Sequence, residues 1–281
     1  MSLGLAYLAA FSAAFFSSAK DIGSKLLALN ISGAASSVGS FVYALPFFLI
    51  LLALLHGLGY PVFQISSGFW SLIILRALSD AVGESCKMYA FKHGEFSTVS
   101  IILSLLPIFV VGLSVLITND PVTPALLIGA LLVVAASLTV IYKNPQTLKG
   151  SCFALGAVTF MATNTCLDRL AVQTAHPVFS GFAMTALAGL FTAPLFLFDG
   201  SPRELLSERK VLGTRGLFEV LFMAAKLSAL TVLPATVVMI CMRSALIINV
   251  TTGLIYFREG EAKRKIIALL LALAGIIIAL I

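Results

Sequence analysis

Long runs of hydrophobic residues alternate along this chain with short segments that hold its Gly, Pro, Asn and charged residues. A helix crosses the bilayer core with about 20 apolar residues, in a range of roughly 17 to 25. Ten runs fall near this length, and the connections between them are too short to form a soluble domain. The predicted spans cover about residues 3–19, 33–55, 68–91, 97–117, 124–142, 151–169, 177–198, 211–229, 232–257 and 265–281.

Four charged positions of the first half recur in the second half at one constant interval of 139 residues. The pairs are Arg76 and Arg215, Asp80 and Glu219, Lys87 and Lys226, and Asp120 and Glu259. This recurrence indicates two copies of one unit. Because each copy holds five spans, an odd number, the second lies upside down in the membrane, as in many secondary transporters. We predict an all-α integral membrane protein of ten transmembrane helices in two inverted five-helix repeats, residues 1–142 and 143–281.

The composition supports a membrane environment. Of 281 residues, 60% are hydrophobic and 11% charged, and the mean hydropathy is +1.08, whereas soluble domains carry about 25% charged residues. The net charge of +6 does not indicate nucleic-acid binding, because the basic residues lie at the ends of apolar runs and not in one patch. The four cysteines are isolated and the sequence has no His/Cys cluster, so we expect no metal, no cofactor and no disulfide framework.

Basic residues are distributed unequally between the two faces of the predicted bundle. The segments 56–67, 118–123 and 171–176 on one face hold no Lys or Arg. Those on the other face hold Lys20, Lys25, Lys92, Lys143, Lys149, Arg203, Arg209, Lys210, Arg258, Lys263, Arg264 and Lys265. The positive-inside rule makes the second face cytoplasmic and places both termini outside, in the inner membrane of the cell. The first span lacks a preceding basic segment, so we expect it to remain in the protein and not to be cleaved as a signal peptide.

The end of each half has a recurring pattern: a helix with a proline, an acidic turn, and a helix with spaced glycines. The first half has Pro107, Asp120 and Gly129, while the second has Glu259 and Gly275, with Leu246 in place of the proline. In this the chain resembles the EamA-type ten-helix branch of the drug/metabolite transporter superfamily. The resemblance implies two inverted repeats around a central cavity, lined mainly by the third, fourth, eighth and ninth helices with help from the first and sixth. Many relatives have both termini inside, but we follow the charge distribution.

Arg243 is the most informative polar residue, because it lies near the middle of the ninth predicted span. A central arginine costs about 2.5–3.5 kcal/mol on insertion scales, so it should face a cavity or a partner. Its guanidinium can bind a carboxylate or phosphate through two parallel hydrogen bonds. We therefore predict that Arg243 binds substrate; the structural alternative is an ion pair with Glu84 or Glu219.

Lys87 and Lys226 are further candidate substrate-binding residues. Each lies near the end of its span, at opposite membrane faces if the repeats are inverted. The alternative for both is that the aliphatic stem lies in lipid while the ammonium reaches the interface.

Charged residues in the third and eighth predicted spans have helical spacing. Arg76 and Asp80, like Arg215 and Glu219, are four residues apart, which predicts a structural ion pair within each helix. Glu84 lies on the same face, and Met223 replaces it in the second copy. A carboxylate in a low dielectric environment can carry a proton, so Glu84 is a candidate for proton coupling. The alternative is an ion pair with Lys87, which would favour the ionised carboxylate instead.

Small polar residues mark the fourth and sixth spans. Ser100 and Ser104, from the series that begins at Ser97, and Asn164 in the sixth span are candidate hydrogen-bonding groups for a substrate. Such residues more often pack helices or bond to the preceding turn. Asp120 and Glu259 lie in loops, where we expect helix-end or ion-pairing groups and not ligands.

Three functions follow as hypotheses. The first is a secondary transporter of a small anionic or zwitterionic metabolite, working by alternating access. The second is a proton-coupled exporter of hydrophobic cations, and the third is a non-transporting membrane subunit or lipid-handling protein. The sequence has no nucleotide-binding motif, zinc helix or nucleophile elbow, which argues against an ATP-driven pump and an enzyme. The expected partners are a small-molecule substrate and the lipid bilayer, with the protein a monomer or homodimer.

Overall fold

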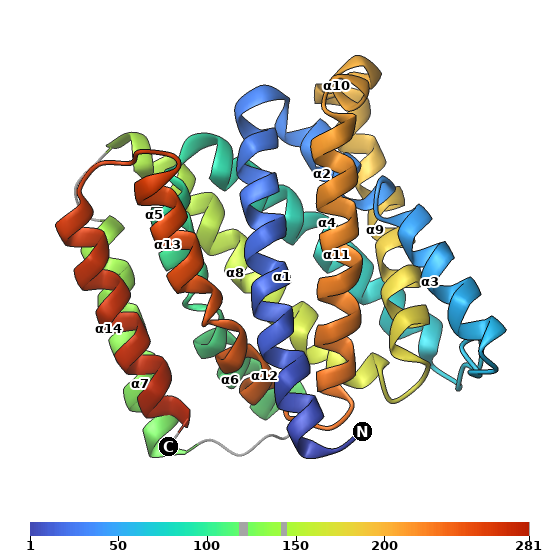
Figure 1. The fold of residues 1–281 in the computed structure, drawn as a ribbon. Helices are drawn as coiled ribbons and strands as arrows, with labels where there is room; N and C mark the ends of the chain where they lie inside the picture. Colours follow the sequence, from blue (N-terminus) through green and yellow to red (C-terminus); the bar gives the residue numbers. More distant parts are fainter. Residues whose placement is uncertain (118–122, 142–144, 281) are drawn as a thin grey trace.

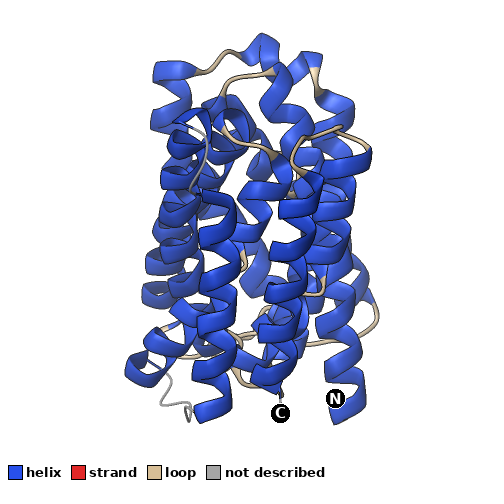
Figure 2. Cartoon of the chain, turned by 90° about the vertical axis from the view of Figure 1, so that its left-hand side faces the viewer, coloured by secondary structure: helices blue, strands red, loops and turns tan. Residues whose placement is uncertain are grey.

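The computed structural model describes residues 1–117, 123–141 and 145–280. Within these ranges the regular structure is helical, apart from one isolated bridge between Ile65 and Ala175. The helices pack side by side, with most of their axes along one direction and short loops at the two ends of the bundle (Figure 2).

The helices fall into two halves. Those of the first half are α1 (Leu3–Asn30), α2 (Gly33–Val42), α3 (Leu45–Gly57), α4 (Phe69–His93), α5 (Phe96–Leu103), α6 (Leu106–Ile117) and α7 (Pro124–Ile141). Those of the second half are α8 (Pro145–Ala171), α9 (Pro177–Asp199), α10 (Pro202–Ser207), α11 (Arg209–Leu230), α12 (Ala235–Met242), α13 (Ala245–Ile255) and α14 (Ala262–Leu280). Both termini lie at the end of the bundle opposite α10 (Figure 1).

Six helical stretches of the described residues are long and apolar enough to cross a membrane. They are Leu3–Asn30, Gly33–Gly57, Phe96–Ser114, Leu148–Ala171, Pro177–Asp199 and Ala235–Ile255. The helices α4 and α11, with 25 and 22 residues, are also long enough but carry more charge. Their charged residues include Arg76, Glu84, Lys87, Arg215 and Lys226, whose side chains are buried in the bundle and not exposed at its surface. The chain is thus a multi-pass integral membrane protein.

The first helix corrects the sequence analysis. We expected a span at 3–19 with Lys20 and Lys25 in the following loop, but α1 continues unbroken to Asn30 and both lysines are buried. Lys25 donates to the carbonyl oxygens of Phe91 (2.7 Å) and Gly94 (2.8 Å) at the end of α4, and Lys20 pairs with a carboxylate of α11. These partners compensate for burying the ammonium groups, so the helix need not end before them.

The main helix contacts follow the repeat. The helix α1 packs along α11, α4 packs along α8, and α7 pairs with α14 at one edge of the bundle (Figure 1). The interval of 139 residues relates α4 to α11, so the first two contacts are counterparts. Where α7 packs against α14, a Cβ on Gly275 would come within 2.5 Å of the Gly129 carbonyl oxygen. This close approach of the two backbones explains why position 275 is a glycine. The predicted boundary between the halves, residues 142 and 143, lies outside the described residues.

Two helical stretches are broken at equivalent positions. Ser104 is the C-cap of α5 and Arg243 the C-cap of α12, again 139 residues apart. Pro107, which lacks an amide hydrogen, accounts for the first break. The second occurs without a proline, since Leu246 stands at that position. There Ser244 donates from Oγ to the Cys241 carbonyl oxygen (2.9 Å) and provides a local alternative to the helical hydrogen bond.

Candidate functional site

A central cavity with a volume of about 90 Å³ lies between the two halves. Its lining comes from α1, α2, α4, α5, α6, α8, α11, α12 and α13, which agrees with the helices that the family resemblance implies. The charged residues in this lining are Lys20, Asp21, Arg76, Asp80, Glu84, Lys87, Glu219, Lys226 and Arg243. Together with Arg215 and Asp168 behind them, most of these groups form two networks.

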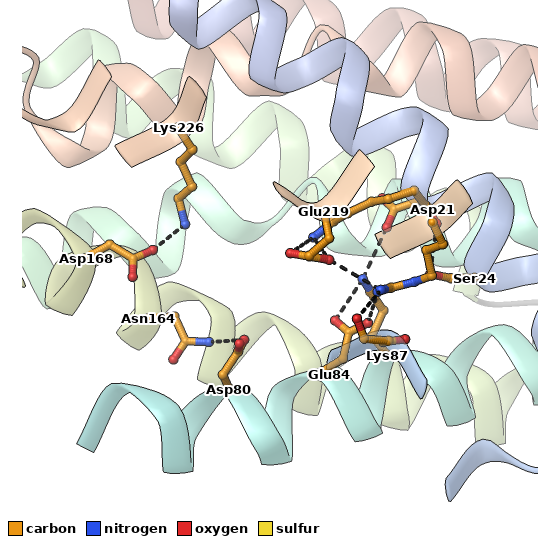
Figure 3. A network of polar contacts seen from close by, with 12 residues as sticks. Asp21, Ser24, Asp80, Glu84, Lys87, Asn164, Asp168, Glu219 and Lys226 are labelled. Atoms are coloured by element: carbon orange, nitrogen blue, oxygen red, sulfur yellow. Dashed lines mark hydrogen bonds and ion pairs between the residues drawn. The ribbon is translucent and has the colours of Figure 1, made fainter. Parts of the chain in front are cut away.

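The larger network joins α1, α4 and α11 toward the end of the bundle that carries α10. Its residues are Lys20, Asp21, Glu84, Lys87, Arg215 and Glu219. Glu84 is bound by Arg215 Nη2 (2.5 Å) and Lys87 Nζ (2.9 Å). Lys87 also reaches Asp21 Oδ1 (3.2 Å), and Lys20 binds both carboxylate oxygens of Glu219 at 3.0 Å. Figure 3 shows this network as one closely connected group.

The smaller network joins α4, α8 and α11 nearer the termini. Its residues are Arg76, Asp80, Asp168 and Lys226. Asp168 is fully buried and accepts from Arg76 Nε and Lys226 Nζ, both at 2.7 Å. Arg76 also pairs with Asp80, to which Asn164 donates from Nδ2 at 2.9 Å. In Figure 3 this group lies apart from the larger network, on the other side of the view.

Arg243 differs from the other cations of the cavity. It makes no ion pair with any described residue. The predicted alternative partners, Glu84 and Glu219, bind other cations. The Arg243 Nη1 donates instead to the Leu103 carbonyl oxygen (2.8 Å), at the last residue of α5. A cation at the C-terminal end of a helix is favourable, because the last carbonyls have no partner within the helix. Arg243 thus links the two helix breaks.

The structure distinguishes among the other predicted site residues. Lys87 and Lys226 are buried, so neither reaches the interface, but both are paired with carboxylates and are not free cations. Ser100 and Asn164 line the cavity, whereas Ser104 is absent from the lining and bonds to the Ile101 carbonyl oxygen at 2.5 Å. The structure thereby separates Ser104 from the other candidates.

The ion pairs predicted within single helices are present, but each belongs to one of the two networks that join several helices. Arg76 contacts Asp80, and Arg215 Nη1 lies 3.4 Å from Glu219 Oε2. Each arginine also reaches a carboxylate on another helix, at Asp168 or Glu84. Spacing along one helix predicted the first kind of contact and could not predict the second.

Several residues of the site were not assigned a role from the sequence. Lys20 was expected in a loop, and Asp21 and Asp168 were given no role, although all three form ion pairs in the networks. Asn249 lines the cavity in α13, within an apolar run, and an isolated amide in such a run is the signal that could have identified it. A carboxylate at Asp168 in an apolar span is the same kind of signal.

Apart from Arg76 Nη1, which forms an ion pair with Asp80, four polar side-chain atoms of the cavity lining are buried without a hydrogen-bond partner among the described residues. They are Ser100 Oγ, Asn164 Oδ1, Arg243 Nε and Asn249 Oδ1. An unsatisfied buried polar atom costs about 1–3 kcal/mol. A bound solute or water can supply the missing partners, so these atoms mark a polar binding surface.

Glu259 acts at a helix end, as predicted. It accepts from the backbone amides of Phe96 and Ser97 at the start of α5 and pairs with Lys265 Nζ at 3.1 Å. A carboxylate there satisfies amides that have no partner within the helix. Its repeat counterpart, Asp120, lies outside the described residues.

A family model described as the EamA-like transporter family matches residues 4–142 and again residues 148–281. Among solved structures, one crystal structure is similar to the chain with a TM-score of 0.71 and 14% sequence identity. The match covers 99% of this chain and 97% of that chain, and at this identity the likeness is one of fold. The comparison with curated proteins gave no match.

Proposed function

Because the chain belongs to the EamA-like transporter family of the drug/metabolite transporter superfamily, we propose that it is a secondary active transporter of a small anionic or zwitterionic metabolite. One observation carries this proposal: Arg243 lines the central cavity without an ion-pair partner in the described chain, while each other charged lining residue has one. A guanidinium in this position attracts a carboxylate or phosphate. Arg243 is therefore the proposed binding group for the anion.

The proposed mechanism is alternating access by ten transmembrane helices in two inverted repeats, with both termini outside the inner membrane. Ion pairs join the two halves in both networks. Lys20 with Glu219 and Arg215 with Glu84 belong to the larger network, and Arg76 with Asp168 belongs to the smaller one. Opening the cavity to one face requires the pairs nearer that face to separate, so the two networks serve as opposing gates. A proton on Glu84 would weaken its bonds to Arg215 and Lys87, and this is how Glu84 would couple a proton.

The same contacts argue against the two other hypotheses. An exporter of hydrophobic cations needs a carboxylate that is free to bind its cargo, but Asp21, Asp80, Glu84 and Glu219 are each paired. A non-transporting subunit with basic residues in lipid is not favoured either, because Lys87 and Lys226 are buried within the bundle.

The test is counterflow in liposomes with labelled organic anions and amino acids. We expect Arg243→Ala to reduce uptake about 10- to 100-fold, since a hydrogen bond to a charged group contributes about 1.5–3 kcal/mol. Arg203→Ala, on the exposed part of α10, is the matched control and should leave uptake unchanged. Anion uptake that survives Arg243→Ala at the wild-type rate would contradict the proposal.

A further inference from the structure

The ionisable groups of the cavity and its two networks carry one excess positive charge. The cations are Lys20, Arg76, Lys87, Arg215, Lys226 and Arg243, and the carboxylates are Asp21, Asp80, Glu84, Asp168 and Glu219. Five cations balance five carboxylates, and Arg243 is the remaining one. In a low-dielectric site a net charge is costly, so the solute that binds best is the one that brings the sum to zero.

Two neutral side chains place unsatisfied polar atoms in the same cavity lining as Arg243. Ser100 precedes Leu103 by three residues in α5, so both lie on the helix face that Arg243 reaches. Asn249 follows Ala245 and Leu246 by four and three residues in α13, and all three line the cavity. The Ser100 and Asn249 side chains are buried, with 3% and 5% exposed residue surface, and Ser100 Oγ and Asn249 Oδ1 have no partner in the described chain.

Another part of the lining is apolar and deformable. Met161, Met223, Met239 and Met242 face the cavity together with Phe222. Methionine side chains are unbranched and polarisable, so they adapt to apolar groups of different shape. The cavity thus offers apolar side chains as well as polar groups.

From these three observations we infer that the cargo is an organic monoanion with an apolar body. Its carboxylate binds Arg243, with further hydrogen bonds from Ser100 and to Asn249 if the solute carries a donor, and its apolar part packs against the methionines and Phe222. This rests on the proposed function and narrows it. A dianion would leave one negative charge unmatched. A zwitterion would leave Arg243's charge uncompensated overall, and its ammonium would find each lining carboxylate already paired.

The experiment compares four solutes that share one apolar body. Isocaproate is the monoanion, L-leucine the zwitterion, isobutylsuccinate the dianion and isoamylammonium the cation. Binding to the purified full-length protein in detergent is measured from the rise in melting temperature with ligand concentration. We expect isocaproate to bind at least about 10-fold more tightly than each of the others, which corresponds to about 1.4 kcal/mol.

Two substitutions at Arg243 separate charge from folding. Arg243→Gln should abolish the stabilisation by isocaproate, whereas Arg203→Gln, on the exposed part of α10, should preserve it. If Arg243→Gln fails to fold, Arg243→Lys carries the test. This variant keeps the charge, so it should bind isocaproate several-fold more weakly but still prefer it over isobutylsuccinate.

The outcomes distinguish this inference from the proposed function. If L-leucine or isobutylsuccinate binds more tightly than isocaproate, and this binding depends on Arg243, the inference that the cargo is a monoanion would be wrong. The proposed function, transport of an anionic or zwitterionic metabolite, would remain. Stabilisation by isoamylammonium alone would overturn both. Stabilisation by none of the four would overturn the inference, and counterflow would then decide the proposed function by itself.

Discussion

The two charge networks share one pattern of ion pairs but differ in the number of carboxylates that each lysine contacts. In each, an arginine pairs with an acidic residue four positions later, and a lysine from the neighbouring long helix binds an aspartate on α1 or α8. In the larger network Lys87 has both Asp21 and Glu84, whereas in the smaller one Lys226 has Asp168 as its carboxylate partner. The difference arises where the repeat is imperfect, since Met223 stands at the counterpart of Glu84. Symmetric positions can thus depend on very different numbers of contacts.

The largest expected effect is at the less redundant aspartate. Asp168→Asn removes the charge that holds Lys226 and Arg76 together, leaving Lys226 as a buried cation without a carboxylate. Removal of one partner from a buried pair costs about 3–5 kcal/mol. At Asp21, the corresponding aspartate of α1, the same change should cost only about 1 kcal/mol, because Lys87 keeps Glu84 at 2.9 Å.

Thermal unfolding of both variants in detergent measures this difference. Asp168→Asn combined with Lys226→Met should recover part of the loss, since the second change removes the unpaired charge. Equal losses for Asp168→Asn and Asp21→Asn would mean that the two networks are equally redundant.

A smaller effect is expected from the packing beside the larger network. Gly216 follows Arg215 in α11, and a Cβ there would overlap the backbone carbonyl of Tyr43 at the break between α2 and α3. Its repeat counterpart is Ala77, so the equivalent place in α4 accommodates a methyl group. Gly216→Ala should therefore destabilise the protein by about 1–3 kcal/mol through overpacking.

Gly213→Ala, one turn earlier in the same helix, is the matched control. No atom lies within 4 Å of a Cβ built there. Because alanine favours helix over glycine by about 0.5–1 kcal/mol, this change should raise the melting temperature slightly. A similar response to the two substitutions would show that α11 does not pack closely against the break.

The smallest effect is expected outside the networks. Arg264 pairs with Glu261 at 2.9 Å, and the two side chains are 24% and 57% exposed. An exposed pair contributes about 0–1 kcal/mol, so Arg264→Gln should change the melting temperature little. A loss comparable to that of Asp168→Asn would show that burial does not set the contribution of these ion pairs.

The sequence alone predicted the features that depend on local pattern. The apolar runs of suitable length coincide with helices of the structure. Charged residues at a fixed interval in these runs indicated the repeat. Spacing of four residues predicted Arg76 with Asp80 and Arg215 with Glu219. Glu259 was identified as a helix-end group because acidic residues in short turns commonly bind the free amides of a following or neighbouring helix.

The remaining contacts depend on which helices pack together. Lys20 follows an apolar run that would by itself suffice for a span, and only the packing of α1 on α11 brings it to Glu219. Asp168 becomes central because α8 lies along α4. The helix break at Arg243 has no proline from which it could have been predicted. The hydrogen bond from Arg243 to Leu103 joins residues from opposite halves of the chain.

The pair α7 and α14 packs closely on itself at the edge of the bundle and supplies none of the described cavity lining. Leu131 in α7 and Leu270 in α14 are exposed on its outer surface. A spectroscopic probe attached at either position would therefore not contact a solute in the cavity. This edge of the bundle thus offers a reference position from which the opening of the cavity to each membrane face could be followed.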